Sequence, residues 1–372
     1  MKALLLSAYA AQSHVHWQQG LLRMFPDWQW QVLSLPPRHF SWRVRGNPLY
    51  WSIAERGLLE QDYGLLVATS MVDLATLRGL VPSLARIPAI VYFHENQFDY
   101  PQHARQHSLL EAQMVSLYSA LAADRIVFNS AYNRDGFLAG CRDLLQRLPD
   151  YVPAGVVAGL DAKASTLPVP IELPGEEAVL PWWPGLLADG DSRPLRLLWS
   201  GRFEHDKGGD GLLQLLLQLE RSGLDYQLAM LGQQFRNAPP VFARIEQAFS
   251  HRLVQFGYLE SPTQYRAILA AADVIVATAT HEFQGLAVLE AVASGCLPAV
   301  PARLAYTEIY PDKFCYDSHP QDPALEAKAA AGLVIALARD PAAVAPDVSA
   351  YGFAALQSRY RQLFCAVAGL PA

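Results

Sequence analysis

The feature that most constrains this chain is an alternation of short apolar runs with segments of helical length, which occurs twice along the sequence. Such alternation predicts parallel α/β sheets, because two parallel strands must be joined by a long crossover, usually a helix. In the first half we expect strands over Lys2–Ser7, Trp30–Leu35, Gly64–Ala68, Ala89–Phe93 and Arg125–Asn129. The helix-like segments between them are His14–Met24, Val72–Leu80, Ser108–Ala122 and Asn133–Leu138.

A proline-rich stretch over residues 149–194 separates the two alternating halves. Proline fixes φ and removes a backbone donor, so this stretch predicts a linker without regular helix or central strand. Strands then resume at Leu195–Ser200, Gln227–Leu231, Leu253–Phe256, Val274–Ala277 and Leu297–Val300. The helix-like segments of this half are Gly209–Glu220, Pro240–Ser250, Pro262–Ala271, Leu286–Ala293 and a final amphipathic Tyr351–Ala368.

The fold class predicted from this organisation is α/β, with two Rossmann-like parallel-sheet domains facing across a cleft. The expected domains are residues 1–168 and 195–345, joined by a linker over 169–194. Residues 346–372 would carry the last helix back onto the first domain. Ligands of open α/β sheets bind at the carboxyl ends of the strands, so the loops that follow the strands are the candidate sites.

The composition of the 372-residue chain, 52% hydrophobic and 17% charged, is that of a globular protein with sizeable cores. No apolar run reaches the roughly 20 residues of a membrane span. The first ten residues resemble a signal peptide with an Ala-x-Ala end, but the apolar stretch is short and follows one cation, which favours a buried strand. The four cysteines lack C-x-x-C spacing, which argues against a zinc knuckle and fits reduced thiols in the cytoplasm.

The net charge of −6 is unevenly spread along the chain. Residues 1–170 hold 14 Lys/Arg and 13 Asp/Glu, a balance of +1, whereas residues 171–372 hold 15 and 22, a balance of −7. This distribution excludes a strongly basic nucleic-acid binder. Contact with a polyanion would therefore use a local patch in the first half.

The loop at residues 201–209 reads Gly-Arg-Phe-Glu-His-Asp-Lys-Gly-Gly and leads from an expected strand into an expected helix. It brings Arg202, Lys207 and backbone N–H groups together, a combination that suits a diphosphate. The alternative is a solvated charged loop. The motif is neither a Walker A sequence nor a G-x-G-x-x-G fingerprint, so the usual P-loop and dinucleotide interpretations do not apply.

A second group of candidates lies between Glu282 and Glu290, where the chain passes from an expected strand into a helix. Carboxylates accept hydrogen bonds from hydroxyl groups, so the pair suits a sugar and a ribose, while the helix start attracts an anion. The alternative is a capped helix with a surface glutamate. The other donor-binding candidates are Phe283, Gln284, Gly285, Leu286 and Tyr258.

The pair of motifs G-R-F-x-x-x-K-G and E-x7-E resembles the retaining glycosyltransferases of the GT-B fold. The resemblance covers residues 195–300. It implies that Arg202 and Lys207 hold the donor diphosphate, that Glu282 contacts the sugar, and that Glu290 contacts the ribose. Members of this fold use basic side chains and helix N-termini on the diphosphate, so the resemblance implies no metal cofactor.

Segments of the first half narrow the resemblance to the tRNA-queuosine α-mannosyltransferases. They are Ser13-His14 after the first strand, residues 36–45 with Leu49–Ser52, Tyr92–Pro101 and Phe128–Asn133. The family implies transfer of mannose from GDP-mannose to queuosine, the wobble nucleoside of an aspartate tRNA. One departure is Ala10-Ala11, where such enzymes carry a glycine pair, which puts a close backbone approach to a ligand there in doubt.

The acceptor-side candidates are basic, aromatic and polar residues of the first half. Basic and aromatic side chains interleaved over residues 38–45 hold phosphates and stack unpaired bases, although an ordinary exposed turn is the alternative. The candidates for acceptor binding are Ser13, His14, Arg38, Trp42, Arg43, Arg45, Glu95 and Asn96.

His94 follows an expected strand and is the candidate for contacting the transferred sugar, with a locally satisfied histidine as the alternative. It does not belong to an H-E-x-x-H zinc motif, because position 98 is Phe98. His103 and His107 lack a third ligand, and Asp189-Gly190-Asp191 lies in the linker, so we expect no metal site.

The predicted function is therefore a cytoplasmic mannosyltransferase in which His94, Arg202, Lys207 and Glu282 act on GDP-mannose. The predicted partners are the nucleotide-sugar donor and a tRNA, with no stable membrane association and no protein partner. One alternative is a GDP- or UDP-sugar transferase with a lipid or glycan acceptor. That alternative is disfavoured by the Arg-rich 38–45 loop and by the lack of an apolar surface helix. A catalytically silent RNA-binding protein on the same fold is the other.

Overall fold

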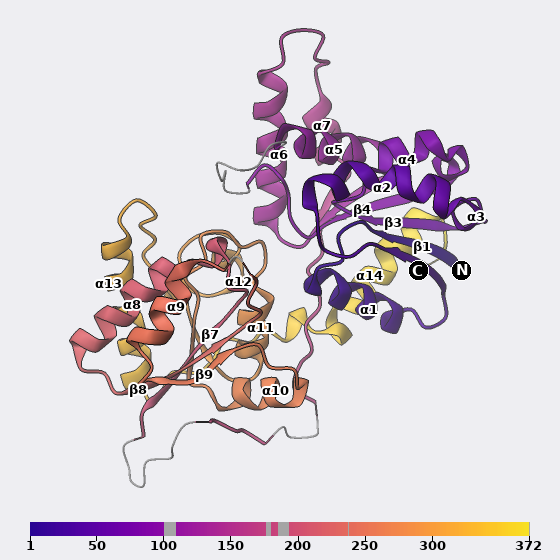
Figure 1. Cartoon of the computed structure of the whole chain (residues 1–372). Helices are drawn as coiled ribbons and strands as arrows, with labels where there is room; N and C mark the ends of the chain where they lie inside the picture. Colours follow the sequence, from indigo (N-terminus) through magenta and orange to yellow (C-terminus); the bar gives the residue numbers. More distant parts are fainter. Residues whose placement is uncertain (100–108, 176–179, 185–192, 237, 372) are drawn as a thin grey trace. The chain divides into compact units, whose positions relative to one another are not determined.

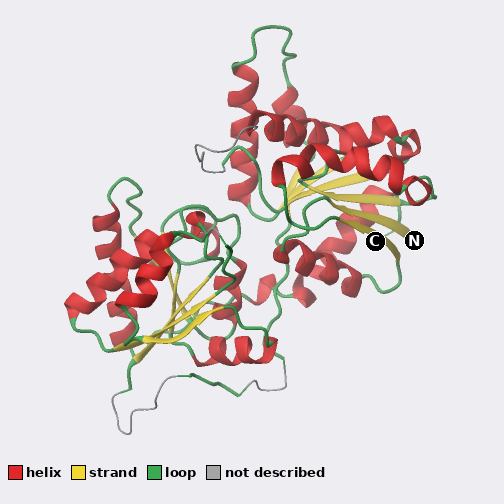
Figure 2. Cartoon of the chain, viewed as in Figure 1, coloured by secondary structure: helices red, strands yellow, loops and turns green. Residues whose placement is uncertain are grey.

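The computed structural model describes residues 1–99, 109–175, 180–184, 193–236 and 238–371, and it divides into two compact units (Figure 1). The first unit comprises Met1–Pro170 together with Phe353–Ala372, and the second comprises Ile171–Gly352. Each unit holds one parallel sheet of six strands with helices on both faces (Figure 2). The predicted α/β class is confirmed.

The sheet of the first unit has the strand order β2-β1-β3-β4-β5-β6. Its strands are β1 Lys2–Ser7, β2 Gln29–Ser34, β3 Leu65–Thr69, β4 Ala89–Phe93, β5 Arg125–Phe128 and β6 Ala164–Thr166. Its helices are α1 Gln12–Met24, α2 Phe40–Ala54, α3 Arg56–Leu59, α4 Leu74–Leu80, α5 Leu109–Ala122, α6 Ala131–Gln146, α7 Val156–Asp161 and α14 Phe353–Ala368. The central strands are apolar throughout because helices cover both of their faces.

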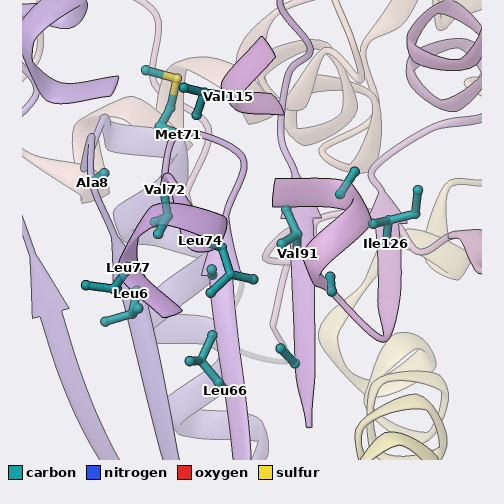
Figure 3. Packing of buried hydrophobic residues seen from close by; sticks show 14 of the residues in the cluster. Leu6, Ala8, Leu66, Met71, Val72, Leu74, Leu77, Val91, Val115 and Ile126 are labelled. Atoms are coloured by element: carbon teal, nitrogen blue, oxygen red, sulfur yellow. The ribbon is translucent and has the colours of Figure 1, made fainter. Parts of the chain in front are cut away.

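The core on one face of this sheet is built from aliphatic side chains of β1, β3, β4 and β5 (Figure 3). Leu6 and Leu66 are fully buried there with Val72 and Leu77, which come from the chain around α4. On the other face, α14 packs against α1, and the ring of Phe364 stacks on Phe25 at 5.5 Å between centroids. The last helix thus belongs to the first unit, although 182 residues of the second unit precede it.

Two expectations about the first half are wrong. The proline-rich stretch is not free of regular structure, because Pro153 and Pro168 flank α7 and the edge strand β6 rather than interrupt them. Residues 40–45 are the first turns of α2, not a loop or turn. The helix tolerates Pro48 because the buried Asn47 side chain donates, at 3.0 Å, to the carbonyl oxygen of Val44, which the missing amide of Pro48 leaves without its helical donor.

The sheet of the second unit has the order β12-β11-β10-β7-β8-β9. Its strands are β7 Leu195–Ser200, β8 Tyr226–Leu231, β9 Leu253–Gly257, β10 Val274–Val276, β11 Leu297–Pro301 and β12 Cys315–Tyr316. Its helices are α8 Gly209–Ser222, α9 Pro240–Ala248, α10 Pro262–Ala271, α11 Leu286–Ala293, α12 Tyr306–Ile309 and α13 Pro323–Arg339. The patterns in the sequence did not predict β12, α12 or α13.

The strand order of the second unit places its loops for ligand binding. The chain moves outward from β7 through β8 to β9, then returns to add β10 on the opposite side of β7. The loops after β7 and β10 therefore diverge at the point where the strand order reverses. Ligands of open α/β sheets bind at this switch point, and both predicted donor motifs lie in these two loops.

Candidate functional site

A close backbone contact joins the loop after β7 to the loop after β10. Gly208 has a φ of 69°, and a Cβ atom there would lie 1.8 Å from the carbonyl oxygen of Thr278. The Thr278 hydroxyl donates to the Lys207 carbonyl oxygen at 3.1 Å, and the Thr280 amide donates to the Asp206 carbonyl oxygen at 2.9 Å. Glycine at 208 is what lets the two loops approach, because no other residue fits both the conformation and the space.

The contact brings together Lys207 and Glu282, two of the four residues predicted to hold the donor. Lys207 Nζ lies 3.0 Å from Glu282 Oε2 and 3.2 Å from Asp206 Oδ2. Burial alone would lower the pKa of Lys207, but the carboxylates of Glu282 and Asp206 outweigh it and raise that pKa. The ammonium is therefore charged at neutral pH, and Asp206 is a partner that the sequence analysis missed.

Both carboxylate oxygens of Glu282 are fixed by hydrogen bonds. Its Oε2 receives the Lys207 ammonium, while its Oε1 accepts the backbone amides of Phe283, at 3.1 Å, and Gln284, at 3.4 Å. Burial alone would raise the pKa of Glu282, but Lys207 and the backbone amides of Gln284 and Gly285 outweigh it and lower that pKa. The carboxylate is therefore ionised and fixed in direction, as a hydrogen-bond acceptor for a hydroxyl group must be.

The segment from Phe283 to Leu286 forms the tight entry to α11. Gly285 is the N-cap with a φ of 78°, and a Cβ atom there would lie 2.9 Å from the Tyr306 ring. Phe283 and Gln284 are buried, so their predicted contact with a donor rests on their backbone groups. Leu286 opens the helix, where the first-turn amides make an anion site.

Glu290 lies within α11 and is partly buried. Its Oε2 accepts the hydroxyl of Tyr265, which comes from α10, at 2.9 Å. Burial, and next the charge of Glu290, raise the pKa of Tyr265 well above its usual value, so the phenol keeps its proton and remains a donor. Tyr265 orients Glu290, and nothing in the spacing of the motifs pointed to it.

Arg202 is more exposed than Lys207, with 39% of its side-chain surface accessible against 15%. Its Nη1 lies 3.1 Å from Glu204 Oε2, within the same loop. Burial raises the pKa of Glu204. Glu204 is a second acidic partner that the residue pattern did not reveal, and the Arg202 side chain is partly exposed at the carboxyl edge of the sheet.

Tyr258 follows β9 at the same carboxyl edge of the sheet and is 54% exposed. The loop after β8 lies against the Arg202 loop, because the Gly201 amide donates to the Leu231 carbonyl and a Cβ atom on Gly232 would lie 1.8 Å from the Gly201 carbonyl oxygen. The loops that follow β7, β9 and β10, together with the helix α11 that the last of them enters, thus carry all the predicted donor-binding residues of this unit.

The predicted residues of the first unit gather in part. His14, in the first turn of α1, stacks on His94 after β4, with ring centroids 4.1 Å apart. Glu95 Oε2 lies 3.6 Å from His14 Nε2, and Ser13 is exposed beside it. Burial, followed by the imidazoles of His14 and His16, lowers the pKa of His94 well below its usual value, so that imidazole is neutral.

Asn96 does not present its amide to a ligand. The side chain is fully buried, and its Nδ2 donates to Asp99 and Asn133 while its Oδ1 accepts the amides of Phe98 and Asp99. Asn96 therefore holds the loop after β4, and the structure gives no support to a direct acceptor contact.

The alanine pair at 10–11 does not strain the loop after β1. Ala11 is the N-cap of α1 with a φ of −63°, and the Ala10 amide donates to the Leu35 carbonyl oxygen at 2.9 Å. The backbone here adopts ordinary conformations, so glycine is not required for the fold at this position.

Some side chains of the basic and aromatic segment over residues 38–45 are paired within the first unit, and others are exposed. Arg45 pairs with Asp73 and, at 3.1 Å, with Glu111, so its charge is largely balanced within the unit. Arg38 is exposed, and Arg43 is partly buried. Trp42 is 56% exposed, and its ring covers Gly46, where a Cβ atom would lie 2.5 Å from it.

The outer face of α2 corrects the expectation that the chain has no apolar surface helix. Four large apolar or aromatic side chains on α2 are exposed, namely Trp42, Leu49, Tyr50 and Ile53. Their spacing places them along one side of the helix.

Two further questions concern metal ligands and membrane-spanning helices. His103, His107, Asp189, Gly190 and Asp191 lie outside the described residues. Within the described ranges, no group of three or more His, Cys, Asp or Glu side chains is placed to hold a metal ion. Nor does any helix in the part of the chain that the structure describes have the length and apolar character to cross a membrane.

Comparisons with known proteins agree with this geometry. The family model described as the N-terminal part of tRNA-queuosine alpha-mannosyltransferase matches residues 2–171, and that of glycosyl transferases group 1 matches residues 190–317. A Drosophila melanogaster protein named tRNA-queuosine alpha-mannosyltransferase is 32% identical over 85% of this chain and 83% of its own length. This chain belongs to the tRNA-queuosine alpha-mannosyltransferase family.

Other relatives share one part of the chain or the fold alone. A Mycobacterium tuberculosis GDP-mannose-dependent alpha-(1-6)-phosphatidylinositol dimannoside mannosyltransferase is 31% identical over 34% of this chain and 32% of its own length. The structure of sucrose-phosphate synthase from Thermosynechococcus elongatus matches with a TM-score of 0.65 at 17% identity, covering 99% of this chain and 96% of its own. The lipopolysaccharide outer core galactosyltransferase WaaB matches with a TM-score of 0.59 at 12% identity, covering 98% and 99%. These glycosyltransferase structures confirm the predicted GT-B fold.

Proposed function

We propose that this glycosyltransferase moves mannose from GDP-mannose to queuosine at the wobble position of tRNA(Asp), in the cytoplasm. The observation that carries the proposal is the fixed pair of Lys207 and Glu282 at the switch point of the second sheet, 3.0 Å apart. The pair offers a cation for a diphosphate beside a carboxylate for sugar hydroxyls. The relative that covers most of this chain is named for the same acceptor.

The proposed mechanism uses fixed charges on the departing diphosphate. Lys207 and the exposed Arg202 would stabilise the negative charge that builds on the phosphate while the sugar ring becomes positive. Glu282 would hold sugar hydroxyls, and the acceptor hydroxyl would attack from the face that the diphosphate leaves. We assign no covalent nucleophile, and we propose that the two cations act in place of a divalent ion.

His94 supplies a neutral imidazole to this mechanism. Its low pKa keeps one ring nitrogen as a donor and the other as an acceptor at neutral pH. Such a ring can hydrogen-bond a sugar hydroxyl in either sense without bringing a positive charge near the developing cation.

The experiment that tests the proposal is incubation with a panel of sugar nucleotides and with tRNA that carries or lacks queuosine. Mass spectrometry of the wobble nucleoside should show a mass gain of one hexose only with GDP-mannose and queuosine-containing tRNA. Modification from UDP-sugars alone would overturn the donor, and modification of tRNA without queuosine would overturn the acceptor.

A second candidate function has two observations in its favour. The exposed apolar face of α2 and the partial relative named for a phosphatidylinositol dimannoside both fit a lipid acceptor. Adding lipid-linked acceptors to the same panel separates the two candidates. A catalytically silent RNA-binding protein is disfavoured by the intact Lys207–Glu282 pair, and hydrolysis of the donor without acceptor would exclude it.

Removing the hydroxyl of Tyr265 should weaken the binding of the donor without stopping transfer. In Tyr265→Phe, Glu290 loses the hydrogen bond that orients it, so we expect the KM for GDP-mannose and the Kd for GDP to rise about fivefold, in line with one hydrogen bond of about 1 kcal/mol. Calorimetry with GDP measures the change. Tyr310→Phe is the matched control, because the buried Tyr310 hydroxyl has no hydrogen-bond partner among the described residues. Equal GDP affinity of Tyr265→Phe and the parent would remove Glu290 from the donor site.

Arg43 and Arg45 should differ in their effect on RNA affinity. Arg45 is already balanced by Asp73 and Glu111, whereas Arg43 forms no ion pair with another described residue. We expect Arg43→Ala to weaken tRNA binding several-fold and to reduce the slope of log K against log salt by about one, with a smaller change for Arg45→Ala. Filter binding over a salt series checks both. Unchanged slopes in both variants would exclude this segment from the RNA interface.

A further inference from the structure

The imidazole of His94 is held in place mainly by other rings. His14 stacks on it at 4.1 Å, the Trp17 ring meets it edge-on at 4.9 Å, and Tyr92 lies 4.8 Å away. No described residue makes a hydrogen bond to His94 Nε2, although His94 is buried and only 6% exposed. The direction of the ring therefore depends on how its aromatic neighbours are fixed.

Two of those neighbours are fixed by one residue of the last helix. The Tyr360 hydroxyl, on α14, accepts the indole N–H of Trp17 at 2.9 Å and lies 3.3 Å from the Tyr92 hydroxyl. The rings of Trp17 and Tyr92 in turn stack on each other at 4.3 Å. All three side chains are fully buried.

The hydroxyl and indole hydrogens of this cluster each have a defined acceptor. Tyr92 donates to the carbonyl oxygen of Leu167 at 2.7 Å, and Tyr360 donates to that of Pro168 at 3.0 Å. The indole of Trp17 has a single donor, so its hydrogen bond to Tyr360 is the polar contact that fixes the ring plane. A network whose members are all satisfied specifies one arrangement.

We propose that Tyr360 is a positioning residue for His94, acting through Trp17 across 343 residues of sequence. The proposal rests on the proposed contact of His94 with the transferred sugar. The last helix would then do more than close the first unit, because its Tyr360 hydroxyl sets the direction of the His94 ring. Loss of that hydroxyl leaves the buried indole donor unpaired and frees the Trp17 ring to turn.

Two other residues of α14 anchor the helix at other positions, and one of them supplies a control. Gln357 Nε2 donates to the Met24 carbonyl oxygen at 2.8 Å, and Arg361 pairs with Asp27 at 2.9 Å. These two contacts involve none of the rings around His94. Gln357→Ala should therefore loosen α14 without turning Trp17.

The first test is spectroscopic and needs no activity. In protein labelled at the histidine Cε1 and the tryptophan Nε1, the His94 signal is identified by its loss in His94→Asn, and the Trp17 indole signal by its loss in Trp17→Phe. Tyr360→Phe should move both signals, and Gln357→Ala should move neither. An unmoved His94 signal in Tyr360→Phe, or an equal shift in Gln357→Ala, would overturn the proposal whether or not the proposed reaction is correct.

The second test is kinetic and uses a double-mutant cycle. Tyr360→Phe should lower kcat on the order of tenfold while the KM for the donor stays within about twofold, because ring placement rather than donor binding is lost. In the Trp17→Phe background the same substitution should change kcat less than about twofold, since the link is already cut. The double variant has no unpaired indole donor, so it remains informative even if Tyr360→Phe alone does not fold. If the effects of Tyr360→Phe and Trp17→Phe on kcat simply multiply in the double variant, then Tyr360 does not act through Trp17.

Discussion

Lys207→Ala is expected to lower kcat/KM for transfer about 10³-fold, the effect of removing a preorganised charge from a developing anion. The ammonium lies 3.0 Å from Glu282 and 3.2 Å from Asp206, and both carboxylates keep it protonated. Without it, two carboxylates would face the diphosphate with only the more exposed Arg202 left to compensate for their charge. The Kd for GDP should rise roughly 10- to 100-fold, as for the loss of a charge-assisted hydrogen bond. Steady-state transfer assays and calorimetry measure the two effects.

Two further variants separate charge from packing. Lys207→Met keeps most of the buried stem, so an equal loss in Lys207→Ala and Lys207→Met identifies the charge as the cause. Lys328→Ala removes an exposed lysine from α13 and should behave like the parent. A folded Lys207→Ala variant with near-parent rates and parent affinity for GDP would exclude Lys207 from the donor site.

The parts of this site that the sequence predicted are those that strand ends dictate. The apolar runs that became β7 and β10 fixed which loops share an edge of the sheet, and this alone brought Lys207 toward Glu282. The glycine at 208 was visible as a turn residue. Its contact with Thr278, which closes the site, depends on the three-dimensional packing of the two loops.

The parts that the sequence did not predict depend on contacts from distant segments. Tyr265 and Tyr360 are single residues on amphipathic helices, where an aromatic side chain at a core position has the same pattern whether or not its hydroxyl has a partner. The helix α2 was not predicted; a proline such as Pro48 ordinarily indicates a break, and the hydrogen bond from Asn47 to the Val44 carbonyl that compensates for it exists only in the folded chain. The helix α13 is rich in alanine and shows weak amphipathic periodicity, although Asp322 caps it by accepting the Leu325 amide at 3.0 Å.

Glu282→Ala should abolish transfer to a similar degree and yet leave GDP binding near the parent level. Its Oε1 is tied to two backbone amides and its Oε2 to Lys207, so the carboxylate is a fixed acceptor for sugar hydroxyls. In its absence Lys207 keeps Asp206 as a partner, so the cation remains placed for the diphosphate. A residue that contacts only the sugar moiety affects the transition state of transfer and not the affinity for the free nucleotide.

The contrast between the two substitutions is the sharpest test of the donor site. Lys207→Ala should weaken GDP and transfer together, whereas Glu282→Ala should weaken transfer alone. Glu282→Gln keeps an acceptor oxygen for the backbone amides and should retain more activity than Glu282→Ala, while Glu246→Ala on the surface of α9 should retain all of it. If Glu282→Ala loses GDP affinity as far as Lys207→Ala does, then Glu282 serves to hold the lysine, and the hydroxyls of the sugar must be bound by other residues.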